Sequence, residues 1–261
     1  MLHQLISVYD RRRCDAIRNE KRTTKDVDLI LPSQSQAAEI TLAFSSLGMN
    51  VNLRPVPEVK ITQKETVVSN ADIFVGKICN GLRFSDGMRD RAELFEKMGN
   101  IDLYLLSRED IFLLKSVTDR SRDIDEMAIL YRKGLKKTIL FEECANQNLL
   151  DDPPYARIWE GFLLERMKEL TERYGFRVPW IQELEDIAEM KVGAAIVLNK
   201  VRDSTAYIGA IEQGTGISED ELERYVAHLE GEGLISVDRG RHPHVLSLMP
   251  SKRKNLTPCG K

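Results

Sequence analysis

The chain changes its pattern near residue 150, and this change constrains its fold more than any other feature. Before it, short apolar runs alternate with segments of helical periodicity, as where residues 27–31 precede a helix-like segment that starts at Ser33. Such alternation predicts a sheet with flanking helices. After it, helical segments follow one another until two short apolar runs at residues 234–237 and 244–248. The sequence therefore predicts an α+β protein, with a mixed sheet and flanking helices first and a smaller, mainly helical part second.

The expected elements of the first part are bounded by residues that start or stop helices. Ser33 and Ser107 carry the side-chain oxygen that N-caps use, and Gly48, Gly99 and Gly134 are natural helix stops. Strands are expected at residues 27–31, 51–53, 71–78, 82–84 and 101–106, and helices at 34–47, 88–98 and 108–133. The last of these helices is expected to break near residues 118–121.

A polar segment at residues 146–157 contains Pro153 and Pro154, which cannot continue a helix. We therefore place the first boundary at residue 150. The helical periodicity of residues 156–174 then indicates a connecting helix. The expected organisation is a first domain at 1–150, a helical connector at 151–183, a second domain at 184–250 and a basic flexible tail at 251–261.

The second domain has the order helix, helix, helix and hairpin, which is typical of a winged helix. Such a domain usually places its third helix in the DNA major groove. Here that helix, residues 218–232, has six acids against one arginine, Arg224, and phosphates would repel it. The expected role of this domain is therefore an interaction or dimerisation module, with a homodimer among the partners it allows. The alternative is DNA or RNA contact through Arg239, Arg241 and His242 in the wing, together with the tail.

The whole-chain charge gives no general attraction to nucleic acid or to an anionic membrane. The formal net charge is −3, so a nucleic-acid surface has to be local. No run of about 18 apolar residues occurs, and the first residues lack the charge-then-apolar order of a signal peptide. The four cysteines are widely spaced, as in proteins of a reducing compartment. We expect a cytoplasmic protein with no membrane partner.

Two aspartates in the first expected strand are the main chemical signal. Asp26 and Asp28 lie two residues apart, so an extended strand points both side chains to one side. Two adjacent carboxylates repel each other unless a cation lies between them. Carboxylate oxygens suit Mg²⁺, which also bridges phosphate oxygens. Asp72 is the first candidate for a third carboxylate on a neighbouring strand, and Asp102 is the second.

The segment Arg22-x-Thr24-x-Asp26-x-Asp28 resembles the signature of the nucleotidyltransferase superfamily, which has the fold of DNA polymerase β. It is most similar to the minimal and AbiEii-type branches, which occur in toxin–antitoxin pairs. The resemblance implies transfer of a nucleotidyl group from a nucleoside triphosphate (NTP) to an RNA or protein hydroxyl. Asp26, Asp28 and Asp72 would then be catalytic and hold Mg²⁺ or Mn²⁺, while Arg22 and Thr24 would bind the nucleotide.

A second match to this family lies in the expected helix after residue 107. Lys115, followed by Arg122-Asp123, resembles the family's later lysine and Arg-Asp element. Helical spacing would place Lys115, Asp119 and Arg122 on one face. If that face looks into the cleft, Lys115 and Arg122 can neutralise phosphate charge. An ion-paired helix surface is the alternative reading of the same residues.

One departure from the family concerns its glycine turn. The family carries a Gly-Gly or Gly-Ser turn before the paired aspartates, where backbone N–H groups cradle the triphosphate. This chain has Arg11-Arg12-Arg13 there and no glycine before Gly48. Two hypotheses follow: an active enzyme, or a catalytically degenerate fold that acts as a DNA-binding or protein-interaction regulator. A scaffold without a ligand is a third, and it leaves the paired aspartates unexplained.

Overall fold

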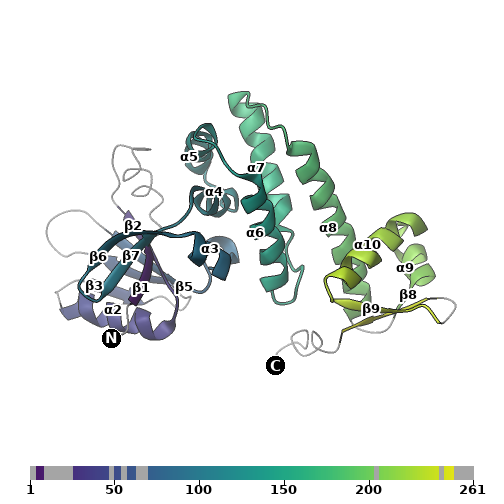
Figure 1. The fold of residues 1–261 in the computed structure, drawn as a ribbon, viewed down its shortest axis with the longest axis horizontal. Coiled ribbons are helices and arrows are strands. Elements are labelled where there is room, and N and C mark those ends of the chain that lie inside the picture. Colours follow the sequence, from purple (N-terminus) through teal and green to yellow (C-terminus); the bar gives the residue numbers. More distant parts are fainter. Residues whose placement is uncertain are drawn as a thin grey trace. The chain divides into compact units, whose positions relative to one another are not determined.

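The computed structural model describes residues 4–8, 26–46, 50–53, 58–62, 70–202, 206–240 and 244–249, which form two compact units (Figure 1). Unit 1 comprises Met1–Glu143 and Arg166–Arg177, and unit 2 comprises Cys144–Glu165 and Val178–Lys261. These units differ from the four segments expected from the sequence, because residues 151–183 are divided between both. The fold is mixed α+β, as expected. Every described helix is too short or too polar to cross a membrane.

Unit 1 is built on a mixed sheet, and seven of its strands are described. Their order across the sheet is β3-β4-β5-β2-β1-β7-β6. β2 pairs in parallel with β5, β1 pairs in parallel with β7, and the other neighbours are antiparallel. The strands are β1 (Gln4–Val8), β2 (Asp26–Leu31), β3 (Asn50–Leu53), β4 (Glu58–Thr62), β5 (Asn70–Val75), β6 (Glu93–Met98) and β7 (Ile101–Leu105).

The expected strand at residues 27–31 and the helix after it are confirmed. Leu29, Ile30 and Leu31 of β2 are all buried, which explains why this strand reads as a continuous apolar run. Helix α2 (Gln34–Ser46) follows at once and packs against β2, β3 and β5. Ser33 caps it, since its Oγ accepts a hydrogen bond from the backbone N–H of Gln36 at 3.3 Å.

The helix expected at residues 88–98 is wrong. Helix α3 (Asp86–Arg91), capped by Ser85, ends early, and β6 then pairs antiparallel with β7. Met98 lies opposite Ile101, so Gly99 and Asn100 form a two-residue turn, and Gly99 has a φ of 61°. A Gly-Asn pair between two apolar runs is a hairpin signal, and here it outweighs the helical spacing of the preceding residues.

The long helix expected after residue 107 breaks where the sequence predicts. Helix α4 (Arg108–Ser116) is capped by Ser107, whose Oγ accepts from the backbone N–H of Asp110 at 3.1 Å. Helix α5 (Ser121–Arg132) follows, and Gly134 has a φ of 85° after its end. Two further helices, α6 (Lys137–Leu150) and α7 (Trp159–Tyr174), come next along the chain.

Unit 2 has the predicted order of helices and hairpin, with one short extra strand. A three-stranded antiparallel sheet in the order β8-β10-β9 accompanies its helices. Leu198, Ile211, Val226 and Leu246 belong to its buried core. Its elements are α8 (Ile181–Arg202), β8 (Ala206–Tyr207), α9 (Ile208–Thr215), α10 (Glu219–Gly231), β9 (Ile235–Asp238) and β10 (Val245–Leu248).

Candidate functional site

The centre of the unit 1 sheet sets two aspartate positions directly opposite each other. In the parallel pairing of β2 with β5, Asp28 is the register partner of Asp72, and Asp26 is the partner of Asn70. Neighbouring strands lie about 4.8 Å apart in a sheet, so these backbone positions are close. Two of the three aspartates expected from the sequence are therefore adjacent across the sheet, and the third lies two residues along the same strand.

The second candidate for the third carboxylate occupies a different part of the sheet. Asp102 lies on β7, and β1 separates β7 from β2. Its register partner on β6 is Lys97, whose Nζ is 3.7 Å from Asp102 Oδ2. Asp102 is thus a buried acid beside a lysine. Between the two candidates, the strand order favours Asp72.

One charged residue next to Asp72 in the sheet was not expected from the sequence. Lys60 on β4 is the register partner of Asp72 on the strand's other side. Lys60, Asp72 and Asp28 therefore follow one another across three adjacent strands. Strand β4 was not expected because Pro55 and Pro57 precede it, and a register between distant segments leaves no local signal in the sequence.

Lys115, Asp119 and Arg122 do not form the single helix face that their spacing predicts. Helix α4 ends at Ser116 and α5 begins at Ser121, so the helical spacing is interrupted between them. The Lys115 side chain is completely buried and forms an ion pair with Glu126 of α5. Asp119 accepts a hydrogen bond from Arg166 Nη2 at 3.0 Å, and Arg122 is exposed. Lys115 therefore acts here as an internal link between two helices.

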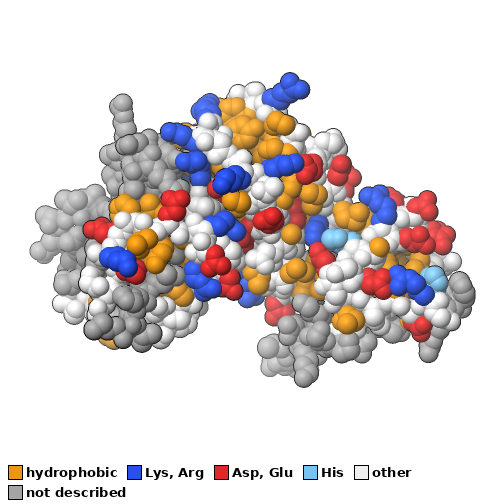
Figure 2. Space-filling model, viewed as in Figure 1, with side chains coloured by type: hydrophobic (Ala, Val, Ile, Leu, Met, Phe, Trp, Pro, Cys, Tyr) orange, Lys and Arg blue, Asp and Glu red, His pale blue; other side chains and the backbone are white. Residues whose placement is uncertain are grey.

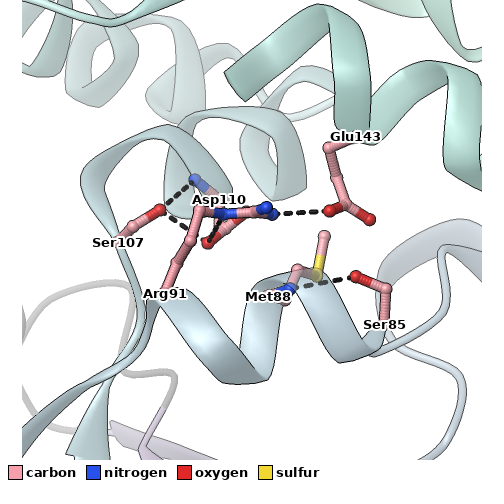
Figure 3. A network of polar contacts seen from close by, with 6 residues as sticks. All are labelled: Ser85, Met88, Arg91, Ser107, Asp110 and Glu143. Carbon is pink, nitrogen blue, oxygen red and sulfur yellow. Dashed lines mark hydrogen bonds and ion pairs between the residues drawn. The ribbon is translucent and has the colours of Figure 1, made fainter. Parts of the chain in front are cut away.

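A second buried ion-pair cluster lies where α3, α4 and α6 meet (Figure 3). Arg91 binds Asp110 through two hydrogen bonds, from Nη2 to Oδ1 at 2.6 Å and from Nε to Oδ2 at 3.2 Å. The same Nη2 donates to Glu143 Oε2 at 2.5 Å. Burial acts to lower the pKa of Arg91, but the hydrogen bonds and charges of Asp110 and Glu143 outweigh it and raise that pKa. Arg91 therefore stays charged.

Close packing around this cluster depends on a glycine. A Cβ at Gly87 would lie 2.9 Å from Arg91 Nη1 and 3.1 Å from Glu143 Oε2. One partial signal for this cluster is present in the sequence, because Asp110 belongs to the Ser107-x-x-Asp110 cap. The Ser107 Oγ donates to Asp110 Oδ2 at 2.5 Å, so this aspartate both takes part in the N-terminal cap of α4 and binds Arg91.

Several predicted site residues lie outside the described residues, and one wing residue lies within them. Arg22, Thr24, Arg241 and His242 are outside, as are the side chains of Asp26 and Asp72. Arg239 is exposed and binds Glu230 of α10 at 2.9 Å and 2.6 Å. The described side chains include no group of three or more histidine, cysteine or acidic residues placed to hold a metal.

A scan against models of protein families and a search of curated proteins both find no match to the chain.

Proposed function

We propose that this protein is a metal-dependent nucleotidyltransferase, which moves a nucleotidyl group from an NTP to a hydroxyl of an RNA or protein acceptor. The observation that carries the proposal is the strand register, which sets Asp28 opposite Asp72 in the centre of the sheet. The Arg22-x-Thr24-x-Asp26-x-Asp28 resemblance supports the same reading. A cytoplasmic location and membership of a toxin–antitoxin pair belong to this proposal.

Carboxylates at neighbouring positions are costly unless a cation neutralises them. Asp26, Asp28 and Asp72 bring three negative charges to one region of the sheet, and the register places one lysine, Lys60, beside them. Like charges at short range disfavour ionisation. Oxygen ligands from two or three carboxylates suit Mg²⁺ or Mn²⁺. The residue types therefore fit a divalent cation that also binds a triphosphate.

The roles of the residues follow from that fit. Asp26, Asp28 and Asp72 would hold the cation, which when bound lowers the barrier by neutralising phosphate charge and activating the attacking oxygen. Arg22 would bind the triphosphate, Thr24 would orient it by hydrogen bonding, and Lys60 is placed to add positive charge. Lys115 is not needed as a phosphate ligand, because Glu126 engages its ammonium.

The order of elements in unit 2 supports a winged helix as its fold. A helix, a short strand, two helices and a hairpin occur in that order, and β8 joins the hairpin strands in one sheet. The acidic α10 and the Arg239–Glu230 ion pair reduce the positive charge available to DNA. Contact through Arg239, Arg241 and His242 remains part of the proposal for this unit, as does homodimer formation.

A second candidate function is a degenerate nucleotidyltransferase fold that acts as a regulator. Two observations favour it: no glycine precedes Gly48, and Lys115 is internal. In that case DNA or partner binding would not depend on Asp28. The regulator would shift DNA equally well as wild type and as Asp28→Asn at low salt and would transfer no label, so the transfer assay below separates the two.

The direct test measures transfer of label from each of four α-³²P-labelled nucleoside triphosphates to total RNA or protein, with Mg²⁺ or Mn²⁺. We expect label incorporation by the wild type and none by Asp28→Asn. Both proteins should unfold at similar temperatures, since the substitution preserves shape. Equal incorporation by the two proteins would overturn the proposal.

A further inference from the structure

Three stacked rings and two arginines form a surface where α5 and α7 end in unit 1. Tyr131 and Phe176 stack with ring centroids 5.0 Å apart, and Tyr174 and Phe176 stack at 5.6 Å. Arg132 lies over the rings, with its Cζ 5.0 Å from the Phe176 centroid and 5.6 Å from that of Tyr174. Arg173 lies 5.5 Å from the Tyr174 centroid. We call Tyr131, Arg132, Arg173, Tyr174 and Phe176 the ring–arginine surface.

Hydrogen bonds and an ion pair hold the rings in place. Tyr131 Oη donates to the carbonyl oxygen of Arg177 at 3.0 Å. The Tyr174 hydroxyl bonds to Asp125, and Arg173 Nη2 lies 2.8 Å from Asp125 Oδ1. The rings are partly accessible and the arginines are exposed. The surface is therefore ordered before any ligand binds, which lowers the entropy cost of binding.

The exposed charge around these rings is mainly positive, although the chain as a whole is acidic. Within residues 117–133 and 171–177, six exposed side chains are basic and three are acidic. The basic ones are Arg120, Arg122, Arg132, Lys133, Arg173 and Arg177, and the acidic ones are Asp119, Asp125 and Glu172. Figure 2 shows Lys and Arg side chains bordering hydrophobic ones at the top of the view, where α7 ends. A polyanion is thus attracted locally, against the net charge of the chain.

We propose that the ring–arginine surface binds single-stranded nucleic acid. The partly accessible rings and the planar guanidinium groups that lie over them offer flat surfaces on which unpaired bases stack, and the exposed arginines are also phosphate ligands. A duplex hides its base faces, so it would use only the charge. An acidic protein would use the charge without needing the stacked rings. The combination of both features favours an unpaired strand as the ligand.

The residues of this surface are different from the sheet aspartates Asp26, Asp28 and Asp72. Binding of nucleic acid to it is expected to need neither metal nor nucleotide. Its test therefore uses neither. Fluorescence anisotropy of the full chain with a fluorescein-labelled U₁₂ RNA, a dT₁₂ DNA and a 12-base-pair duplex is measured over a range of salt concentrations. The single strands should bind more tightly than the duplex at the same salt. A preference of U₁₂ over dT₁₂ would identify RNA as the source of the strand, through its 2′-hydroxyl groups, and equal binding would identify either strand as a ligand.

Two variants separate stacking from charge. Tyr174→Leu keeps an apolar side chain at the end of the ring stack but removes its π face, and it should weaken U₁₂ binding about 5- to 100-fold. Arg132→Gln removes one exposed cation and should reduce the slope of log K against log salt by about 0.7. Arg89→Gln, in α3, removes another exposed arginine whose partner is Asp86 and should change neither quantity.

The outcomes decide the proposal without reference to catalysis. Asp28→Asn should bind U₁₂ like the wild type, so a failure of the nucleotidyltransfer proposal leaves this result unchanged. Circular dichroism checks that Tyr174→Leu is folded, and Arg132→Gln supplies an independent test if it is not. No binding of either single strand at low salt, or equal binding by wild type, Tyr174→Leu and Arg132→Gln, would overturn the proposal.

Discussion

The acids of unit 1 occur in two settings that differ in what stands opposite them. In the helices, buried acids face cations: Glu126 pairs with Lys115, and Asp110 and Glu143 share Arg91. In the centre of the sheet, the register places Asp28 opposite another aspartate, Asp72. The first arrangement balances charge within the protein. The second brings like charges to neighbouring strand positions, with Lys60 at the next position on β4, and carboxylate oxygens so placed suit a bound cation.

This difference indicates that the acids of the helices and the aspartates of the sheet have different roles. A buried acid with a fixed cation contributes to holding its helices together, because removing either partner leaves an uncompensated charge. Acids at neighbouring strand positions offer oxygen ligands to a cation, so replacing them should change activity more than stability. We therefore expect substitutions of the helical ion pairs to lower stability, and substitutions of the sheet aspartates to lower activity.

The largest effect should come from the sheet and appear in activity. Asp72→Asn should lower nucleotidyl transfer by at least about 100-fold, since even the supporting partners of metal ligands are worth 10–100-fold. Asp102→Asn is the matched control, because Asp102 lies beside Lys97 two strands from β2. Steady-state transfer assays on both variants check this. Equal loss in both would remove the distinction between the two aspartates.

The largest effect on stability should come from the helical ion pair. Glu126→Ala leaves the fully buried Lys115 ammonium without its acid, and unfolding free energy should fall by about 3–5 kcal/mol. The double variant Lys115→Met/Glu126→Leu removes both charges and should recover most of that loss. Urea denaturation at neutral pH measures all three proteins. A loss below about 1 kcal/mol in Glu126→Ala would contradict the assignment of Lys115 as an internal link.

A smaller loss is expected at Arg91, whose side chain is 23% exposed and so partly screened. Arg91→Met leaves Asp110 and Glu143 near each other without their shared cation, which should cost about 2–3 kcal/mol. Arg91→Lys keeps the charge but cannot reproduce both hydrogen bonds to Asp110, so its loss should be intermediate. The same denaturation experiment measures the unfolding free energy of both variants. A greater loss in Arg91→Lys than in Arg91→Met would show that charge is not what the cluster requires.

The smallest expected effect is in unit 2, where a cluster of hydrogen-bonded side chains includes the titratable His228. Tyr155 Oη lies 2.8 Å from Lys191 Nζ and 2.8 Å from His228 Nε2, and Lys191 Nζ lies 2.9 Å from Glu232 Oε1. Burial and the nearby Lys191 charge lower the pKa of His228 from its usual 6.5, against the opposing charge of Glu232.

The sign of the resulting pH dependence follows from that lowered pKa. Unfolded His228 binds a proton at higher pH than folded His228 does, so its contribution is present above pH 6.5 and is lost as the pH falls below it. His228→Gln should therefore unfold with a shallower pH dependence between pH 5 and 7 than the wild type. Thermal melts across that range measure the slopes. Parallel slopes would mean that His228 has the same pKa in both states.

Local signals in the sequence predicted where helices begin and end better than they predicted which distant residues are in contact. Ser33 and Ser107 marked helix starts, and Gly134 marked a helix end, because capping depends on a few neighbouring residues. The helical spacing of residues 88–98 gave a wrong helix, because Gly99 fits a helix stop as well as it fits the Gly-Asn turn that the structure shows. The Lys115–Glu126 pair was missed because a helix break changes which residues face each other.

The candidate site shows the same limit. The Asp26–Asp28 spacing identified the strand that carries two of the candidate aspartates, since two residues per repeat is a local property. The choice of Asp72 over Asp102, and the presence of Lys60 in the row, depend on strand order and register. Strand order is set by contacts between distant segments, which no short pattern in the sequence records.

Thermal unfolding with nucleotide and Mg²⁺ shows whether Asp28 and its neighbours bind a metal–nucleotide complex. Each of the four ribonucleoside triphosphates is added with and without Mg²⁺ to the wild type and to Asp28→Asn. Our account predicts a Mg²⁺-dependent rise in melting temperature for the wild type, equivalent to about 2.7 kcal/mol at a hundredfold excess over the dissociation constant. Asp28→Asn should show no such rise. An equal shift in both proteins, or no shift with any nucleotide, would contradict the claim that the aspartate row binds a metal–nucleotide complex.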